Sequence, residues 1–116
     1  MPYVQAMDMD AWKTQLRKGA AELAVLSLLA DGEMYGIEML EAFRARPEIG
    51  IADSTIYPLL NRMEKEGRLK SRWAPDVGSG PPRKYYHLTQ DGLRALEAMR
   101  PVWRAFQAQL SELVGK

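Results

Sequence analysis

Apolar or small residues recur at helical spacing in the first part of the chain. Between Asp8 and Gly32 they follow one another at intervals of four and three positions: Trp12, Leu16, Gly19, Leu23, Leu26 and Ala30. This stripe predicts an amphipathic helix that Asp8 or Asp10 caps and that Asp31 and Gly32 end. Residues 23–29 are apolar nearly all round, so we expect this end of the helix to lie in the centre of the core.

Two shorter helices are predicted next. The segment YGIEMLEAF, residues 35–43, forms the first of them, and Pro47 lies beyond its end. Its apolar face consists of Ile37, Leu40 and Phe43. We expect Asp53 or Ser54 to cap the next helix and Gly67 to end it. Its buried side consists of Ile56, Leu59, Leu60 and Met63.

A β-hairpin and a long helix are predicted in the remainder. Residues 69–73 alternate between apolar or small side chains and basic ones, and residues 83–89 form a second strand after a turn rich in glycine and proline. Thr89 then caps a last helix with the apolar stripe Leu93, Leu96, Met99, Trp103, Phe106, Leu110 and Leu113. Pro101 lies inside this stripe and removes one backbone donor. A kink is favoured over a break, because the stripe keeps its phase across the proline.

The composition narrows the classes of function. The chain has 116 residues, 47% of them hydrophobic, a formal net charge of +1, no cysteine and one histidine, His87. These counts exclude disulfides, thiol catalysis and a multi-histidine metal site within one subunit. We therefore expect a protein that is not an enzyme and has no catalytic residues, no cofactor and no bound metal. The first residues lack the pattern of a secretory signal, and the apolar residues 23–30 are too few to span a bilayer, so we expect a soluble, cytoplasmic protein.

Three helices, a basic hairpin and a long helix follow one another in the order of a winged helix-turn-helix domain, a mainly α fold with a small β-hairpin. A helix fits the major groove of DNA, and residues near its N-terminus reach base edges. The side of the third helix opposite its buried face carries groups that suit such contacts: Ser54, Thr55, Tyr57, Asn61 and Arg62. Residues 62–84 hold seven basic and three acidic side chains, which concentrates positive charge on the third helix and the hairpin.

Each of these features also has a simpler explanation. A basic hairpin is often only a solvated edge that discourages aggregation, and Ser54 and Thr55 are common helix caps. The combination of a polar helix start, a helix stop and a basic hairpin nevertheless favours DNA binding. A winged helix that docks to other proteins is the alternative. RNA binding is less favoured, because the strands offer no stacking platform beyond Tyr85 and Tyr86.

Three stretches of the chain resemble the PadR family of bacterial transcription regulators. They are KGAAELAVLSLLADGEMYGIEML (residues 18–40), STIYPLLNRMEKEG (residues 54–67) and GPPRKYYHLTQDGLRAL (residues 80–96). Together they span nearly the whole chain in the expected order. With only one terminal helix, the chain resembles the short subfamily. The resemblance implies a homodimeric, ligand-responsive regulator, usually a repressor, that binds an operator in double-stranded DNA.

The resemblance also implies roles for individual residues. The residues that open the second helix against the DNA backbone would be Tyr35 and Gly36. The residues that enter the major groove would be Ser54, Thr55 and Tyr57. The hairpin residues that reach phosphates or the adjoining minor groove would be Gly80, Arg83 and Lys84.

The apolar stripe of the last helix predicts a dimer. A chain of this length has little core left to cover the far half of that helix, so the stripe is expected to pair with a second subunit, together with Trp12 and Leu16. The alternative is that the helix folds back on its own domain. We expect residues 1–88 to form the DNA-binding domain and residues 89–116 the dimerisation helix. A small planar aromatic ligand could stack on Trp103 between the subunits, near Trp12 and Leu16.

Overall fold

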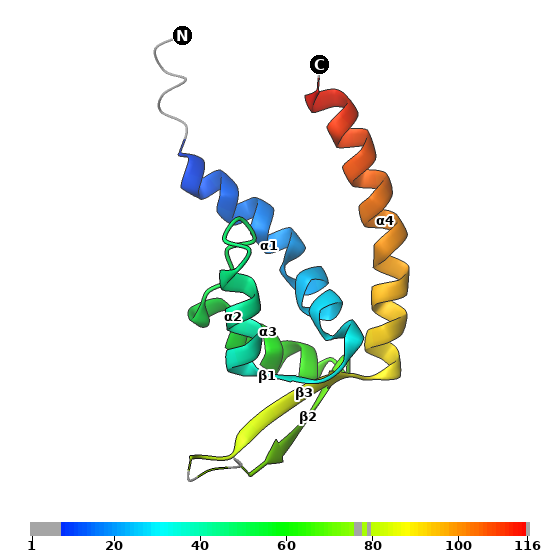
Figure 1. Ribbon diagram of the computed structural model, residues 1–116. Helices are drawn as coiled ribbons and strands as arrows, with labels where there is room; N and C mark the ends of the chain where they lie inside the picture. The colour runs from blue at the N-terminus through cyan, green and yellow to red at the C-terminus, as the bar shows by residue number, and fades with distance from the viewer. Residues whose placement is uncertain (1–7, 76–77, 79, 116) are drawn as a thin grey trace.

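The computed structural model describes residues 8–75, 78 and 80–115, so the N-terminal segment 1–7 and residues 76, 77 and 79 of the predicted turn lie outside the described residues. Within these limits the elements are α1 (Met9–Leu28), the 3-10 helix η2 (Leu29–Asp31), β1 (Met34–Tyr35), α2 (Gly36–Arg44), α3 (Asp53–Lys65), β2 (Leu69–Ala74), β3 (Arg83–Leu88) and α4 (Gln90–Val114) (Figure 1). The predicted fold class is confirmed: the chain is mainly helical, with one small antiparallel sheet.

Most of the predicted helix ends are confirmed. The Asp8 carboxylate accepts hydrogen bonds from the backbone N–H groups of Asp10 and Ala11 at 3.0 and 3.2 Å, so Asp8 is the cap of α1. Thr89 caps α4 in the same way. Gly32 and Gly67 have positive φ angles of 146° and 82°, which only glycine adopts without strain.

The core lies where the apolar stripes of α1, α2 and α3 meet the sheet and the start of α4. Its fully buried residues are Val25, Leu26, Met39, Ile56, Leu60, Met63, Leu69 and Leu96. The expectation that residues 23–29 lie centrally is confirmed for Val25 and Leu26. The predicted face of the second helix is wrong at Ile37, which is 53% exposed. Because α2 begins at Gly36, the stripe that faces the core falls on Met39, Leu40 and Phe43 instead.

The sheet has three antiparallel strands in the order β1-β3-β2. The sequence analysis missed β1, because a strand of two residues has no periodicity to detect. In the register of the central strand, Tyr85 lies between Tyr35 of β1 and Arg72 of β2. The neighbouring Tyr86 points to the core face and is buried.

Helix α4 is continuous through Pro101, so it is not broken there. Its first three turns pack on the core through Leu96 and Met99. Beyond them the described residues 100–115 are all exposed. Figure 1 shows this half of α4 and the N-terminal half of α1 extending away from the sheet, towards the end of the molecule opposite the hairpin. No described helix combines the length and the apolar character that crossing a membrane requires.

Candidate nucleic-acid interface

The start of α3 presents two exposed hydroxyl side chains, Ser54 and Thr55. The predicted cap is wrong. Neither Asp53 nor Ser54 is the N-cap, which is Ala52 and caps without a side-chain hydrogen bond. The Ala52 carbonyl accepts hydrogen bonds from the N–H groups of Thr55 and Ile56 at 2.9 Å each. The two hydroxyls therefore lie in the first helical turn, where they are not used as helix caps, and they can turn towards a ligand.

The start of α2 packs directly against α3. A Cβ atom at Gly36 would lie 2.8 Å from Cε1 and 2.9 Å from the hydroxyl of Tyr57, so only glycine permits this approach. Tyr57 remains 40% exposed. The N–H of Tyr35, the N-cap of α2, donates to the Glu38 carboxylate at 3.0 Å. The structure thus brings together Tyr35, Gly36 and Tyr57, which the resemblance had assigned to DNA.

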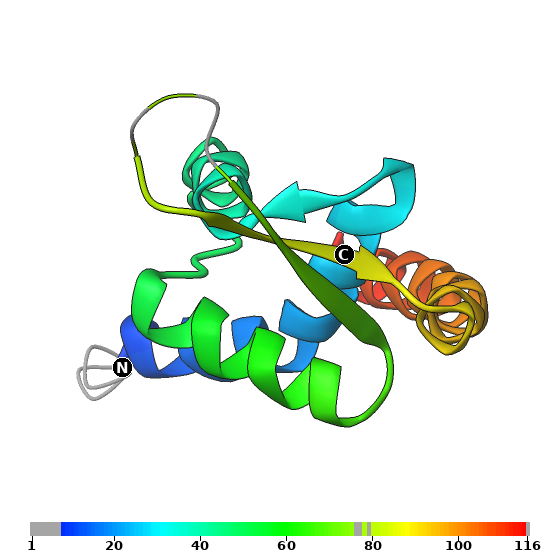
Figure 2. The ribbon, with the colours of Figure 1, turned by 90° about the horizontal axis from the view of Figure 1, so that it is seen from below.

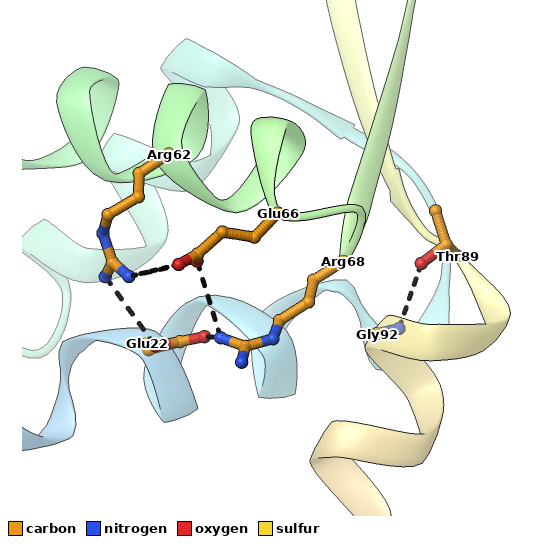
Figure 3. A network of polar contacts seen from close by, with 6 residues as sticks. All are labelled: Glu22, Arg62, Glu66, Arg68, Thr89 and Gly92. Carbon is orange, nitrogen blue, oxygen red and sulfur yellow. Dashed lines mark hydrogen bonds and ion pairs between the residues drawn. The ribbon is translucent and has the colours of Figure 1, made fainter.

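The two polar residues farther along α3 have different surroundings. Asn61 is exposed. Arg62 is held by two carboxylates: its Nη1 lies 3.1 Å from Glu66 Oε1, and its Nη2 lies 3.7 Å from Oε2 of Glu22 on α1 (Figure 3). The guanidinium of Arg62 is therefore committed to contacts within the chain, although half of the side chain is exposed.

The turn after α3 is anchored by α1 and α4, which the sequence analysis did not predict. Arg68 forms ion pairs with Glu22 and Glu66. Its carbonyl accepts a hydrogen bond from the N–H of Thr89 at 3.1 Å. The Thr89 hydroxyl donates to the Gly67 carbonyl at 2.6 Å. It also accepts from the N–H of Gly92 at 3.0 Å (Figure 3). These contacts fix the end of α3 against both helices of the predicted dimer interface.

The hairpin of β2 and β3, which we call the wing, follows α3 in the chain and crosses the molecule from the end of α3 towards α2 (Figure 2). Arg83 and Lys84, which the resemblance grouped together, lie on opposite faces of it. The guanidinium of Arg83 lies over the Tyr35 ring, 4.6 Å from its centroid. Lys84 faces α3 instead, with its Nζ 3.6 Å from Glu64 Oε1 and 5.8 Å from the centroid of the exposed Trp73 ring. Only Arg83 joins the group at the start of α2.

Gly80 is exposed in the segment that joins the two wing strands. That position is compatible with contact to DNA beside the wing.

The charge of this region is smaller than its sequence suggests. At least four of the seven basic residues between positions 62 and 84 form ion pairs with acids of the same chain: Arg62, Arg68, Arg72 and Lys84. Two of those acids, Glu22 and Glu33, lie outside the counted segment. The hydrogen bond from Arg72 lowers the pKa of Glu33, and the same contact raises the pKa of Arg72. Positive charge is thus partly neutralised by residues that are distant in the sequence.

Most of the predicted dimer stripe is exposed within one chain. The exposed members are Leu93, Trp103, Phe106, Leu110 and Leu113 on α4, with Trp12 and Leu16 on α1. Met99 is partly buried against the core. Leu96 is wrong as an interface residue: its side chain is fully buried, because the first turns of α4 complete the core of their own chain. The sequence analysis also missed Val102, which is 67% exposed beside the stripe.

The predicted ligand residues lie on this exposed surface. The Trp103 ring is 43% exposed and lies 6.2 Å from the Phe106 ring, centroid to centroid. A hollow of about 270 Å³ lies elsewhere, between η2, the end of β3 and the start of α4, and it is lined in part by Glu33, His87 and Leu93. Neither Trp103 nor Trp12 lines this hollow. No group of three or more potential metal ligands occurs in the part of the chain that the structure describes.

Comparison with known proteins gives one consistent result. The model of the transcriptional regulator PadR-like family matches residues 25–98. A transcriptional regulator of Mycobacterium tuberculosis is 30% identical over 101 residues, which cover 87% of this chain and 89% of the relative.

Solved structures agree with this result. A PadR family transcriptional regulator from Eggerthella lenta is 34% identical, with 91% of each chain covered and a TM-score of 0.75. A PadR-like transcriptional regulator from Bacillus cereus is 31% identical, with a TM-score of 0.78 over 88% of this chain and 98% of the other.

Proposed function

Because the chain belongs to the PadR-like family of DNA-binding transcriptional regulators, we propose that it binds a palindromic operator as a homodimer and represses transcription until a small ligand binds. The observation that carries the DNA-binding part is the start of α3. Its two exposed hydroxyls, Ser54 and Thr55, lie in a first turn whose backbone N–H groups and partial positive charge also suit a phosphate or a base edge.

The packing of Tyr57 on Gly36 supports a common DNA-facing surface. This contact joins the starts of α2 and α3, and in this proposal both helix N-termini approach the same duplex. Arg83, stacked on Tyr35, adds a cation beside them. In this proposal α3 enters the major groove, while the start of α2 and the wing contact the flanking backbone.

The exposed stripe on α4 supports the homodimer. Most of the large apolar side chains of the stripe from Leu93 to Leu113, and Trp12 and Leu16 on the outer half of α1, are exposed within one chain. A two-fold dimer buries the same patch on both subunits and presents two copies of α3. Its half-sites would lie about one helical turn of DNA, or a multiple of it, apart.

Ligand response is proposed to act through the same helices. A planar aromatic compound would stack on Trp103 between the subunits and favour one spacing of the two α3 helices over another. A coupling of about 1–3 kcal/mol would change operator affinity about 5- to 150-fold. The test is Trp103 fluorescence in a variant that lacks Trp12 and Trp73, titrated with planar aromatic compounds. Absence of quenching across a broad panel would count against a ligand site at Trp103.

The first experiment is selection of binding sites from random duplex DNA at physiological salt. A selected palindrome with one fixed half-site spacing would support a dimeric, sequence-specific regulator. Binding without a shared motif would leave only the electrostatic contribution that any basic surface makes. No binding by the folded protein, with or without added aromatic compounds, would move it to the protein-docking alternative.

A further inference from the structure

An ion pair crosses the full width of the sheet on its outer face. Glu33 immediately precedes β1, Arg72 lies on β2, and β3 runs between those two strands. Nε of Arg72 donates to Oε2 of Glu33 at 2.9 Å, and its Nη2 contacts Oε1, so the guanidinium holds the carboxylate with two nitrogens. Neighbouring strands lie about 4.8 Å apart, so two strand spacings separate the backbones that this ion pair joins.

A row of aromatic contacts lies beneath the same ion pair. The Arg72 guanidinium lies 4.8 Å from the centroid of the Tyr85 ring, which is its direct partner in the register. On the other side Tyr85 meets its second direct partner, Tyr35, edge to face at 5.5 Å. The Arg83 guanidinium lies over the Tyr35 ring, at the other end of this row of contacts. The outer face therefore ties β2 to β1 twice, once by the ion pair and once through the contacts of Arg72 with Tyr85 and of Tyr85 with Tyr35.

This tie matters because β1 is short. It has two residues and two register pairs with β3, Met34 with Tyr86 and Tyr35 with Tyr85. A pairing of that length opens easily when nothing else holds it. The next residue, Gly36, is the first residue of α2. Contacts that keep β1 on the sheet therefore also act on the position of the first turn of α2 relative to the wing, in addition to the core packing of α2.

We propose that Arg72 is a positioning residue for DNA binding: gripped by Glu33 and stacked on Tyr85, it fixes the start of α2 against the wing and does not itself contact a phosphate. This inference rests on the proposed DNA-binding function, because it assigns a role to one residue within that interface. The lowered pKa of Glu33 keeps its carboxylate ionised throughout the neutral range, so the tie is in place under ordinary conditions.

Whether Glu33→Gln strengthens or weakens DNA binding distinguishes a positioning role of Arg72 from a direct contact with phosphate. If Arg72 bound a phosphate, neutralising its carboxylate partner with Glu33→Gln would free the arginine and strengthen DNA binding. If Arg72 acts through position, the same change releases β1 and weakens binding. Arg72→Lys gives a second test, because lysine keeps the charge for a phosphate but loses the paired nitrogens and the flat stacking surface.

The experiment measures the affinity of Glu33→Gln, Arg72→Lys, Arg72→Ala and the Glu33→Gln/Arg72→Lys double variant for a labelled duplex over a range of salt concentrations. Each single variant should bind about two- to five-fold more weakly, the usual range for one exposed ion pair. The double variant should be no weaker than the weaker single one, because the two changes remove one interaction. The slope of log affinity against log salt should stay at the wild-type value, because no phosphate contact is lost.

Asp31→Asn is the matched control. It removes the same charge two residues away in the same turn, and Asp31 has no ion pair among the described residues. Its affinity should equal or slightly exceed that of the wild type. Tighter binding by Glu33→Gln, full affinity in Arg72→Lys, or a salt slope lowered by about one unit in Arg72→Ala would overturn the proposal.

A second readout needs no DNA. Backbone amide exchange at residues 34–37 should become faster in Glu33→Gln and Arg72→Lys, but not in Asp31→Asn, while exchange in the core of α1 stays unchanged. Unchanged exchange at these residues would also overturn the proposal. If the wild type binds no DNA, the proposed function fails, whereas the exchange data still decide whether this ion pair holds β1 in place.

Discussion

The exposed stripe of α4 allows the contribution of a single side chain, Trp103, to the stability of the proposed dimer to be estimated. Trp103 is 43% exposed within one chain. An aromatic side chain buries about 150–250 Å² when fully covered, so about 65–110 Å² of Trp103 is left for a partner to cover. At about 25 cal/mol per Å² this area is worth about 2 kcal/mol. A two-fold dimer contains the contact twice, so Trp103→Ala should cost about 4 kcal/mol, a factor of about 10³ in the dimer dissociation constant.

Sedimentation velocity over a dilution series measures this constant for the wild type and the variant. Arg104→Ala is the control, because Arg104 is the next residue of α4 and also exposed, but one helical position turns its side chain by about 100°, away from the apolar stripe. Trp103→Ala should dissociate at far higher concentration than the control, with no change in the helical circular dichroism of the folded chain. Equal dissociation constants for Trp103→Ala and Arg104→Ala, or a wild type that is monomeric throughout the series, would refute the reasoning.

The remaining predictions concern packing, DNA contact and pH. A Cβ at Gly92 would overlap the backbone carbonyl oxygen of Arg68, whereas a Cβ at Gly19 on α1 would have nothing within 4 Å. Gly92→Ala should therefore destabilise the fold by about 1–3 kcal/mol and Gly19→Ala stabilise it by up to about 1 kcal/mol in urea unfolding at fixed protein concentration; equal effects would contradict the steric argument. Arg83→Ala should lower the salt slope of DNA binding by about one unit, while Thr55→Ala should change the selected sequence and leave that slope alone; the reverse pattern would exchange their assigned roles. Because the pKa of Glu33 is lowered in the folded protein, its contribution is complete above the ordinary carboxyl pKa and disappears as pH falls through the lowered value, so protection of the β1 amides should be lost only in acid; loss near neutral pH would contradict it.

The amino-acid sequence alone determined the fold class and most of the helix ends. These features depend on short-range patterns: apolar spacing of three and four, a capping side chain such as Asp8 or Thr89, and a glycine such as Gly67 at a helix stop. The exposure of two residues of the proposed DNA-binding surface was also predictable. Ser54 and Thr55 are exposed at the start of α3, as their place in the helix pattern implied.

The cap of α3 was not predictable in the same way. Its sequence offers two good capping side chains, Asp53 and Ser54, and the structure uses neither. Asp53 is instead the first residue of α3, and its Oδ1 lies 3.5 Å from Nη2 of Arg44 at the end of α2, a contact that lies outside the local sequence pattern. The small strand β1 also depends on a distant part of the chain, because Met34 and Tyr35 form a strand by pairing with β3.

Tertiary structure alone decided which charged side chains are paired within the chain and which apolar residues of the long helix stay exposed. Arg72 pairs with the carboxylate of Glu33, 39 positions earlier in the chain, and Arg68 pairs with a carboxylate on α1. Arg83 and Lys84 are neighbours in sequence but lie on opposite faces of the wing. Leu96 belongs to the same periodic stripe as the exposed residues of α4 but is buried in its own chain. Periodicity reports the face of an element, whereas the contact that covers that face is made by residues far away in the sequence, and no local pattern contains that information.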